Sequence, residues 1–349
     1  MGCLQSSEKK SQLDEESKDT KPKVYSWETR GDVDTSNFII QNEVEQVVGR
    51  MPGQLSGQQC IIQNCEKSDI YIFDHSATVS VDDCINCRIF IGPSKGSVYI
   101  RDCSDCKFVV ACQQFRTRDC KQLDVFLCCN TQPIIESSTG MKFGCFQYNY
   151  PNLQGQFDDA GLSIFNNNWS NIHDFTPAND VKTWTLLPKD ANVNEYVPFP
   201  SPDKFPEIEV SADLDSSVVP VTLGSRRKTS DESCLVVFFP RNGATHNAKS
   251  FLREMRLNSF DLVRTKEIQM SSEDAQRVFG RERDLSHLQQ GTAIGLEING
   301  DNCVEVCNKV FMALFDGEST SEVAFVSSSK DTADKNIDDF YNFVDMTMS

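Results

Sequence analysis

Four stretches of the sequence repeat at a nearly constant interval, and each carries a cysteine at the same position. The intervals are 19, 19 and 17 residues, and the cysteines are Cys65, Cys84, Cys103 and Cys120. Apolar residues recur five and seven positions after each cysteine, as the pairs Ile70/Ile72, Ile89/Ile91, Phe108/Val110 and Val125/Leu127. A short fixed period is typical of a solenoid, in which each repeat forms one coil and stacked coils share a core. Short alternating segments with Gly, Asn and Asp between them predict that the coils form a parallel β-helix.

Two pairs of cysteines inside the repeat also have the spacing of a zinc site. The pattern C-x2-C-x15-C-x2-C normally indicates four-cysteine zinc coordination, and it is formed by Cys84, Cys87, Cys103 and Cys106. The repeat explains the same residues without a metal. Cys84 and Cys103 share a register with Cys65 and Cys120, while Cys87 and Cys106 share one with Ser68 and Leu123. Because equivalent residues of stacked coils lie about 4.8 Å apart, we interpret the four cysteines as ladder positions and expect no metal site.

The composition excludes some classes of function. A chain of 349 residues has room for two domains, and its formal net charge of −17 argues against a nucleic-acid-binding protein, which would carry a basic patch. The same charge disfavours electrostatic adhesion to an anionic membrane. No apolar segment follows Met1 and no run of 18 apolar residues occurs, so we expect an intracellular chain. Its fifteen cysteines, an odd number, are then expected to be reduced and mostly buried as small apolar residues.

The first residues match a lipidation pattern. Gly2 follows the initiator methionine and Ser6 lies at the favoured position for N-myristoylation, with Cys3 beside Gly2 as a candidate for S-palmitoylation. One myristoyl chain binds membranes only marginally, whereas a second acyl chain makes anchoring stable. The alternative is a chance Met-Gly start with a free thiol at Cys3. We favour dual acylation and expect residues 1–23 to form a flexible, acylated N-terminus.

The rest of the chain divides into two expected domains and a linker. We assign residues 24–200 to the β-helix and expect its aromatic and Asn-rich last part to pack along the solenoid. Residues 201–232 are rich in proline and charge, as linkers are. Inside the linker, the basic run Arg226-Arg227-Lys228-Thr229-Ser230 is either a phosphorylation site or, as we favour, a solvated segment.

Residues 233–349 have the alternating pattern of a small α/β domain. Strands are predicted over 234–239, 260–268, 292–298 and 323–326, and helices over 244–257, from 271 onwards, over 303–315 and over 338–343. Ser271 and Asp274 supply capping chemistry for the second helix. This order of strands and helices predicts a ferredoxin-like α/β sandwich.

Only one segment suggests chemistry. The histidines are scattered (His75, His173, His246 and His287), and neither standard glycine-rich phosphate-binding loop occurs. The segment Gln113–Arg118 differs because the interval before Cys120 is two residues shorter than the others. Arg116 and Arg118 lie on one face if this segment is extended. Arg116, which takes the register of Ile61, Ser80 and Tyr99, is either a structural arginine paired with Asp119 or Glu136, or an arginine finger for another protein's active site.

At these residues the chain resembles a known family. The coil region is similar to the tubulin-binding cofactor C domain through Gly57-Gln58-Gln59, Ile70–Asp74, Gly92-Pro93, Cys112–Arg116 and Pro133–Glu136. With the acylation motif and the C-terminal sandwich, the resemblance covers essentially the whole chain. It implies a mainly β plus α/β protein, with a right-handed parallel β-helix followed by the sandwich. It also implies a GTPase-activating protein for an Arf-like small GTPase, Arf-like 3, in ciliary trafficking of lipidated proteins.

The resemblance assigns roles to individual residues. Arg116 would be the finger that neutralises charge on the transferred phosphoryl group. Gln113 would help to orient it, and Glu136 would hold it through a charge-assisted hydrogen bond. The residues expected to contact the GTPase or its GTP are Gly96, Ser97, Gln113, Gln114, Phe115, Arg116 and Phe175. A plain turn over residues 92–97 explains the glycines there equally well.

The implied partners are the GTP-bound Arf-like GTPase and, through the acyl chains, the membrane. The implied locations are the cytoplasmic face of the plasma membrane, the region of the cilium and basal body, and the cytoplasm. We expect a monomer that binds no nucleic acid and needs no cofactor of its own, because the partner binds GTP and Mg. Two alternatives stay open. The chain could be a non-catalytic effector or scaffold that recognises the GTP state, or a tubulin-folding cofactor.

The C-terminal domain resembles nucleoside diphosphate kinases. Those enzymes carry phosphate on a histidine after the third strand and helix, and no histidine follows His287 in this chain. We therefore expect a non-catalytic domain.

Overall fold

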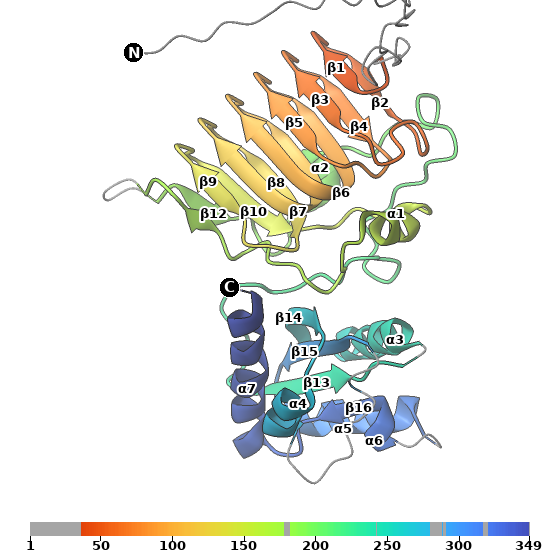
Figure 1. Cartoon of the computed structure of the whole chain (residues 1–349), viewed down its shortest axis with the longest axis vertical. Helices are drawn as coiled ribbons and strands as arrows, with labels where there is room; N and C mark the ends of the chain where they lie inside the picture. The colour runs from red at the N-terminus through yellow and green to blue at the C-terminus, as the bar shows by residue number, and fades with distance from the viewer. Residues whose placement is uncertain are drawn as a thin grey trace, which may run out of the picture. The chain divides into compact units, whose positions relative to one another are not determined.

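The computed structural model describes residues 36–177, 182–241, 243–279, 288, 291–316 and 320–348. Residues 36–349 make up one compact unit. Within it, Figure 1 shows a stack of strands formed by the N-terminal part and a smaller sheet with helices formed by the C-terminal part. Gly2, Cys3 and the rest of the expected acylated segment lie outside the described residues, as does His287.

The N-terminal part is a parallel β-helix, as predicted. Its strands stack in two series, β1-β3-β5-β6-β7-β9-β11 and β2-β4-β6-β7-β8-β10-β12, and the long strands β6 and β7 belong to both. Pairing is parallel throughout each series. The strands are β1 (Ile39–Gln41), β2 (Val47–Arg50), β3 (Cys60–Gln63), β4 (Asp69–Ile72), β5 (Val79–Asp82), β6 (Arg88–Arg101), β7 (Lys107–Arg118), β8 (Asp124–Cys129), β9 (Ile134–Glu136), β10 (Met141–Cys145), β11 (His173–Asp174) and β12 (Trp184–Leu186).

The Asn and Asp residues of the repeat shape the corners between the two series. The residue before each repeat cysteine has a φ of 53° or 54°, and these residues are Asn64, Asp83, Asp102 and Asp119. A second left-handed residue follows two positions after each cysteine, at Lys67, Asn86, Asp105 and Gln122. Asn and Asp tolerate the left-handed region better than most residues with a side chain. These paired kinks turn the chain from one series of strands into the next.

The repeat cysteines form columns inside the β-helix. Bridges one residue after each cysteine align Glu66, Ile85, Ser104 and Lys121 in successive coils, which confirms the predicted register. The Cys84 amide donates to Cys103 Sγ over 3.4 Å, and the Cys87 amide donates to Cys106 Sγ over 3.3 Å. All fourteen cysteines of the described residues are buried and reduced. The zinc-like spacing is therefore accounted for by two neighbouring columns.

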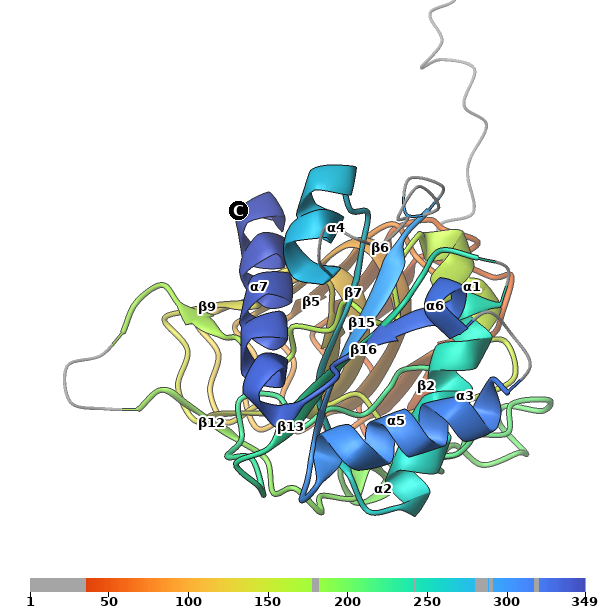
Figure 2. The same cartoon turned by 90° about the horizontal axis from the view of Figure 1, so that it is seen from below.

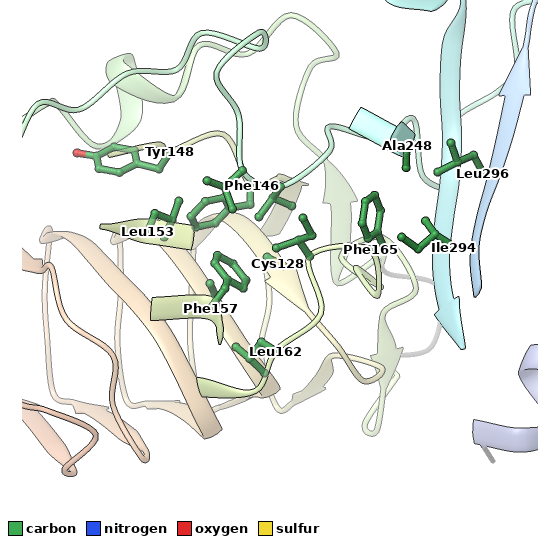
Figure 3. Close-up of a cluster of buried hydrophobic side chains, with 14 of the residues drawn as sticks. Cys128, Phe146, Tyr148, Leu153, Phe157, Leu162, Phe165, Ala248, Ile294 and Leu296 are labelled. Atoms are coloured by element: carbon green, nitrogen blue, oxygen red, sulfur yellow. The ribbon is translucent and has the colours of Figure 1, made fainter. Parts of the chain in front are cut away.

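Residues 145–200 pack against the β-helix with two short helices, α1 (Leu153–Ala160) and α2 (Val193–Tyr196). In Figure 3, Phe146, Leu153 and Phe157 gather near Cys128, while Phe165 approaches Ile294 of the C-terminal domain. One buried apolar cluster thus continues from the β-helix into that domain. A hydrogen bond of 2.7 Å from Thr265 Oγ1 to the Phe165 carbonyl reinforces this junction.

The C-terminal domain has the predicted ferredoxin-like topology. Its sheet has the order β14-β15-β13-β16 with antiparallel pairing. The elements are β13 (Ser233–Phe238), α3 (Ala244–Leu257), β14 (Asp261–Ile268), α4 (Ser272–Phe279), β15 (Ala293–Asn299), α5 (Cys303–Leu314), α6 (Thr320–Val323), β16 (Ala324–Val326) and α7 (Lys330–Met348). Helix α3 packs beside α5, and α4 packs beside α7, as seen from below in Figure 2. The last helix is longer than the 338–343 segment that was predicted.

Candidate functional site

Strand β7 presents the candidate finger on a regular strand. Its burial alternates over the last five residues, so that Gln114, Arg116 and Arg118 point outward while Phe115 and Thr117 point into the core. This is the period of two expected for a strand with one solvated face. Within the described part of the chain, no carboxylate lies within ion-pair distance of the Arg116 guanidinium. The strand therefore presents Arg116 with its hydrogen-bonding groups available.

Arg116 lies in the middle of a row of outward-facing residues. The parallel register places Tyr99 of β6 on one side of it and Ile134 of β9 on the other, and the row continues through Ser80 and His173. This confirms the predicted register of Arg116 with Ser80 and Tyr99. We call the surface around this row the arginine face; it consists of Ser97, Tyr99, Arg101, Gln114, Arg116, Arg118, Ile134, Glu136, His173 and Phe175.

The shortened interval before Cys120 arises from bulges in β6 rather than from a change in β7. Ile91 pairs with Val110, Ser94 with Cys112 and Ser97 with Gln114. Between successive paired positions, β6 therefore advances by three residues while β7 advances by two, and this happens twice. The predicted turn over residues 92–97 is wrong, because this segment is an irregular part of a strand. The two extra residues of β6 are absorbed there, and the rows that follow are again in register.

Gly96 has a structural reason to be glycine. Its amide donates to the Ala77 carbonyl over 2.8 Å, and a Cβ at this position would lie only 2.7 Å from the same oxygen. Ser97 is half-buried, and its hydroxyl donates to Gln114 Oε1 over 3.1 Å. This bond ties two expected contact residues together at the edge of the arginine face.

Gln113 directly precedes Gln114 in β7, between the part of the strand that pairs with β8 and the part that pairs with β9. Its carbonyl accepts hydrogen bonds from the Thr131 amide over 3.1 Å and from Thr131 Oγ1 over 2.9 Å. Its backbone is thus fixed, and the residue is half-buried.

Glu136 is exposed on the arginine face but is paired with Arg118 rather than with Arg116 in the register. No hydrogen bond joins the Glu136 and Arg116 side chains in the described structure. Arg118 Nε lies 3.4 Å from Asp119 Oδ2, so the pairing with Asp119 considered for an arginine here is made by Arg118. The expected hold of Glu136 on Arg116 would need a change of side-chain rotamer.

Two aromatic side chains flank the arginines. Phe175, which follows β11, is 66% exposed, and its amide donates to the Ile135 carbonyl over 2.9 Å, which brings it alongside Glu136. Tyr99 is 38% exposed and was not singled out from the sequence. It could have been found from the sequence, because the repeat register places Tyr99 beside Arg116. Large exposed aromatic side chains beside arginine are characteristic of protein-binding surfaces.

Phe115 does not belong to the exposed surface. It is fully buried, and its ring packs edge-on against Phe143 with a centroid distance of 6.1 Å. It therefore cannot touch a partner directly, and its contribution is to hold the backbone of Gln114 and Arg116 in place.

The chain is similar to one described family and to several named proteins. A family described as Tubulin binding cofactor C matches residues 57–175. Protein XRP2 of Gallus gallus is 55% identical over 93% of this chain and 90% of its own length, and Protein XRP2 of Homo sapiens is 52% identical over 100% of this chain and 99% of its own. A solved structure, Tubulin Binding Cofactor C from Leishmania major, is 22% identical with a TM-score of 0.31, and the match covers 44% of this chain and 92% of that one.

Proposed function

The chain belongs to the XRP2 (X-linked retinitis pigmentosa 2) family, and on this basis we propose that it is a GTPase-activating protein for an Arf-like small GTPase, Arf-like 3. Arg116 is the arginine finger in this proposal. The observation that carries it is an exposed arginine without an ion pair among the described residues, presented from the middle of a rigid sheet. Fingers supplied in trans accelerate GTP hydrolysis strongly because they stabilise charge on the transferred phosphoryl group.

The arginine face divides the work between its residues. The GTPase brings GTP and Mg, and Arg116 enters its cleft and donates to the phosphate oxygens. Gln113 and Gln114 orient the finger and the docked partner, with Ser97 fixing the Gln114 amide. Tyr99 and Phe175 supply apolar contact area on either side. Glu136 approaches the Arg116 guanidinium in the complex and limits its rotation.

The experiment is a single-turnover hydrolysis assay with a panel of GTP-loaded Arf-like GTPases. Arg116→Ala should lower the stimulated rate roughly 10³- to 10⁵-fold, while binding to the GTP-loaded partner is largely kept. Arg88→Ala is the matched control, since Arg88 is an exposed arginine of the same β6–β7 pair that is bound to Asp69 at the opposite end of β6. Stimulation by Arg116→Ala at the wild-type level would refute the finger.

The same assay separates the alternatives. A non-catalytic effector would bind the GTP-loaded partner and leave its hydrolysis rate unchanged. A tubulin-folding cofactor, which the family description Tubulin binding cofactor C raises, would stimulate none of the Arf-like GTPases.

We also propose that Gly2 is myristoylated and Cys3 palmitoylated, which would place the protein on the cytoplasmic face of the plasma membrane and near the cilium. Among the described helices, none is both long enough and apolar enough to cross a bilayer. Gly2→Ala should release the protein to the cytosol, and Cys3→Ser should leave a weaker, reversible association, as fractionation can measure. A membrane-bound Gly2→Ala variant would contradict this proposal.

The C-terminal domain is proposed to lack nucleoside diphosphate kinase activity. Incubation with radiolabelled ATP should produce no acid-labile phosphoprotein, because no histidine follows His287. Detection of such an intermediate would overturn this assignment.

A further inference from the structure

The basic run of residues 226–230 is exposed at Arg227, Lys228 and Thr229, in keeping with a solvated segment, but specific contacts also hold it. It is the sequence Arg226-Arg227-Lys228-Thr229-Ser230 in a chain whose formal net charge is −17. The run contacts both the N-terminal part of the chain, at Trp169, and the C-terminal sheet, at Glu297. Thr229 is exposed, and arginines stand two and three residues before it. An exposed threonine that follows two arginines in the sequence, of which Arg227 is exposed, is what a kinase with a carboxylate-lined substrate groove would recognise.

One buried amide holds the end of the run. The backbone amides of Thr229 and Ser230 both donate to Asn299 Oδ1 over 3.1 Å. Asn299 is fully buried at the end of β15, and its Nδ2 donates in turn to the Ser230 carbonyl over 2.8 Å and to the Glu232 carbonyl over 2.7 Å. The Asn299 side chain therefore holds the backbone of Thr229, Ser230 and Glu232 at once.

The start of the run is held by other contacts. The Arg226 guanidinium lies 4.9 Å from the centre of the Trp169 ring, and Nη2 donates to the Leu187 carbonyl over 2.6 Å. Lys228 Nζ lies 2.5 Å from the carboxylate of Glu297, which is 1% exposed. The run thus links the Trp169 region of the N-terminal part to the C-terminal sheet.

The Thr229 hydroxyl can act only as a donor in this arrangement. Oγ1 lies 3.2 Å from Asp261 Oδ2 and 3.3 Å from Asn299 Oδ1, and both of these atoms are acceptors. Asp261 already pairs with Lys189 over 2.8 Å. A group that replaced this hydroxyl proton with negative charge would face two acceptor oxygens at close range.

We propose that Thr229 is a phosphorylation site for a kinase that reads basic residues, and that the phosphate releases residues 226–230 from Asn299 and Asp261. In the transfer, Thr229 Oγ1 attacks the γ-phosphorus of ATP, the bond from this phosphorus to the β–γ bridging oxygen breaks, and ADP leaves. The hydroxyl proton passes to the catalytic carboxylate of the kinase. This site does not depend on the GTPase-activating function proposed above.

The released state follows from the charge of the product. A phosphothreonine carries about −1.5 to −2 charges at pH 7 and only accepts hydrogen bonds from the protein. Repulsion from Asp261 removes the Thr229 side chain from its place, and the two amides bonded to Asn299 then lose their acceptor. The phosphate and the Asp261 carboxylate then compete for the ammonium group of Lys189.

The test uses the full chain with ATP and the catalytic subunit of a kinase directed by basic residues. Mass spectrometry should locate phosphate on Thr229, and hydrogen exchange should show the amides of residues 229–232 exchanging about tenfold faster or more, as the loss of a good hydrogen bond implies. A peptide of residues 222–233 shows whether the kinase reads the run. If the peptide is phosphorylated and the folded chain is not, or if only Ser230 reacts, the proposed site is refuted.

Matched variants separate charge from loss of the hydroxyl. Thr229→Val removes the hydroxyl that receives the phosphate and should abolish labelling, whereas Ser230→Ala should leave labelling unchanged. Thr229→Glu should reproduce the faster exchange of residues 229–232, while the neutral Thr229→Gln should reproduce it to a smaller extent. Phosphate on Thr229 with unchanged exchange, or equal effects of Glu and Gln, would refute release by charge.

Discussion

Two neighbouring residues of β7 should respond in opposite ways to truncation. Phe115→Ala empties a fully buried site, whereas Arg116→Ala removes an exposed side chain from the same strand. We expect the first change to destabilise the β-helix and the second to leave its stability almost unaltered.

The cost of Phe115→Ala follows from its surroundings. The residue is 0% exposed, stacks on Val98 of the preceding coil and packs edge-on against Phe143. Loss of a buried phenyl group costs about 3–5 kcal/mol, of which an aromatic pair supplies roughly 0.5–1.5 kcal/mol. If the loss is about 4 kcal/mol, a domain of this size should unfold roughly 8–16 °C lower.

Tryptophan fluorescence gives a selective assay. All three tryptophans, Trp27, Trp169 and Trp184, lie within residues 24–200, and residues 233–349 contain none. The melting curve therefore reports the β-helix even if the two domains unfold separately. Arg116→Ala, as the control, should shift the midpoint by less than about 2 °C, since exposed substitutions change stability by roughly 0.5 kcal/mol or less. A Phe115→Ala midpoint within about 3 °C of wild type would show that Phe115 does not hold the strand.

Three further results are expected. Gly96→Ala should cost about 1–3 kcal/mol in thermal stability, because its Cβ would meet a backbone carbonyl at 2.7 Å, and a neutral result would mean that β6 can shift. Glu297→Ala should lower the free energy of unfolding in urea by about 1.5–3 kcal/mol, because it removes the buried carboxylate that pairs with the partly exposed side chains of Lys228 and Arg264; wild-type stability would contradict this. In the unacylated chain, a thiol reagent at pH 8 should modify no more than one of the fifteen cysteines quickly in the native state and all fifteen after unfolding, since fourteen are buried and burial raises the pKa of Cys60 to about 11.

The sequence repeat was sufficient to predict the stacking of the coils. A period marked by cysteine and flanking apolar residues fixes which residues stack, because each coil can bury its apolar side only against its neighbours. The position of Arg116 in the row of Ser80 and Tyr99 followed from this register alone. The alternation of the C-terminal domain was equally informative, since α3 begins and ends where its apolar spacing does.

Other features depend on contacts that no local pattern contains. The segment around Gly92 has turn-forming residues, yet the neighbouring strands on both sides draw it into a bulged strand. The side chain of Phe175 reaches the arginine face only because β11 returns to pair with β9. Glu136 is one of several acidic residues in the sequence, and its pairing opposite Arg118 is set by the stacking of β9 on β7. The proline-rich composition of residues 201–232 likewise gave no sign of the amide of Asn299 that receives the basic run.

Arg116 lies on an inner strand of the sheet, with a paired strand on each side, and not on a loop. Its Cα cannot advance toward a partner without moving β6 and β9 as well. A partner must therefore bring its cleft up to the strand, because the guanidinium can extend from the surface only by the length of the arginine side chain. In the proposed complex, any conformational adaptation would therefore occur in the partner, and productive collisions would be selected by orientation rather than by a conformational change in this chain.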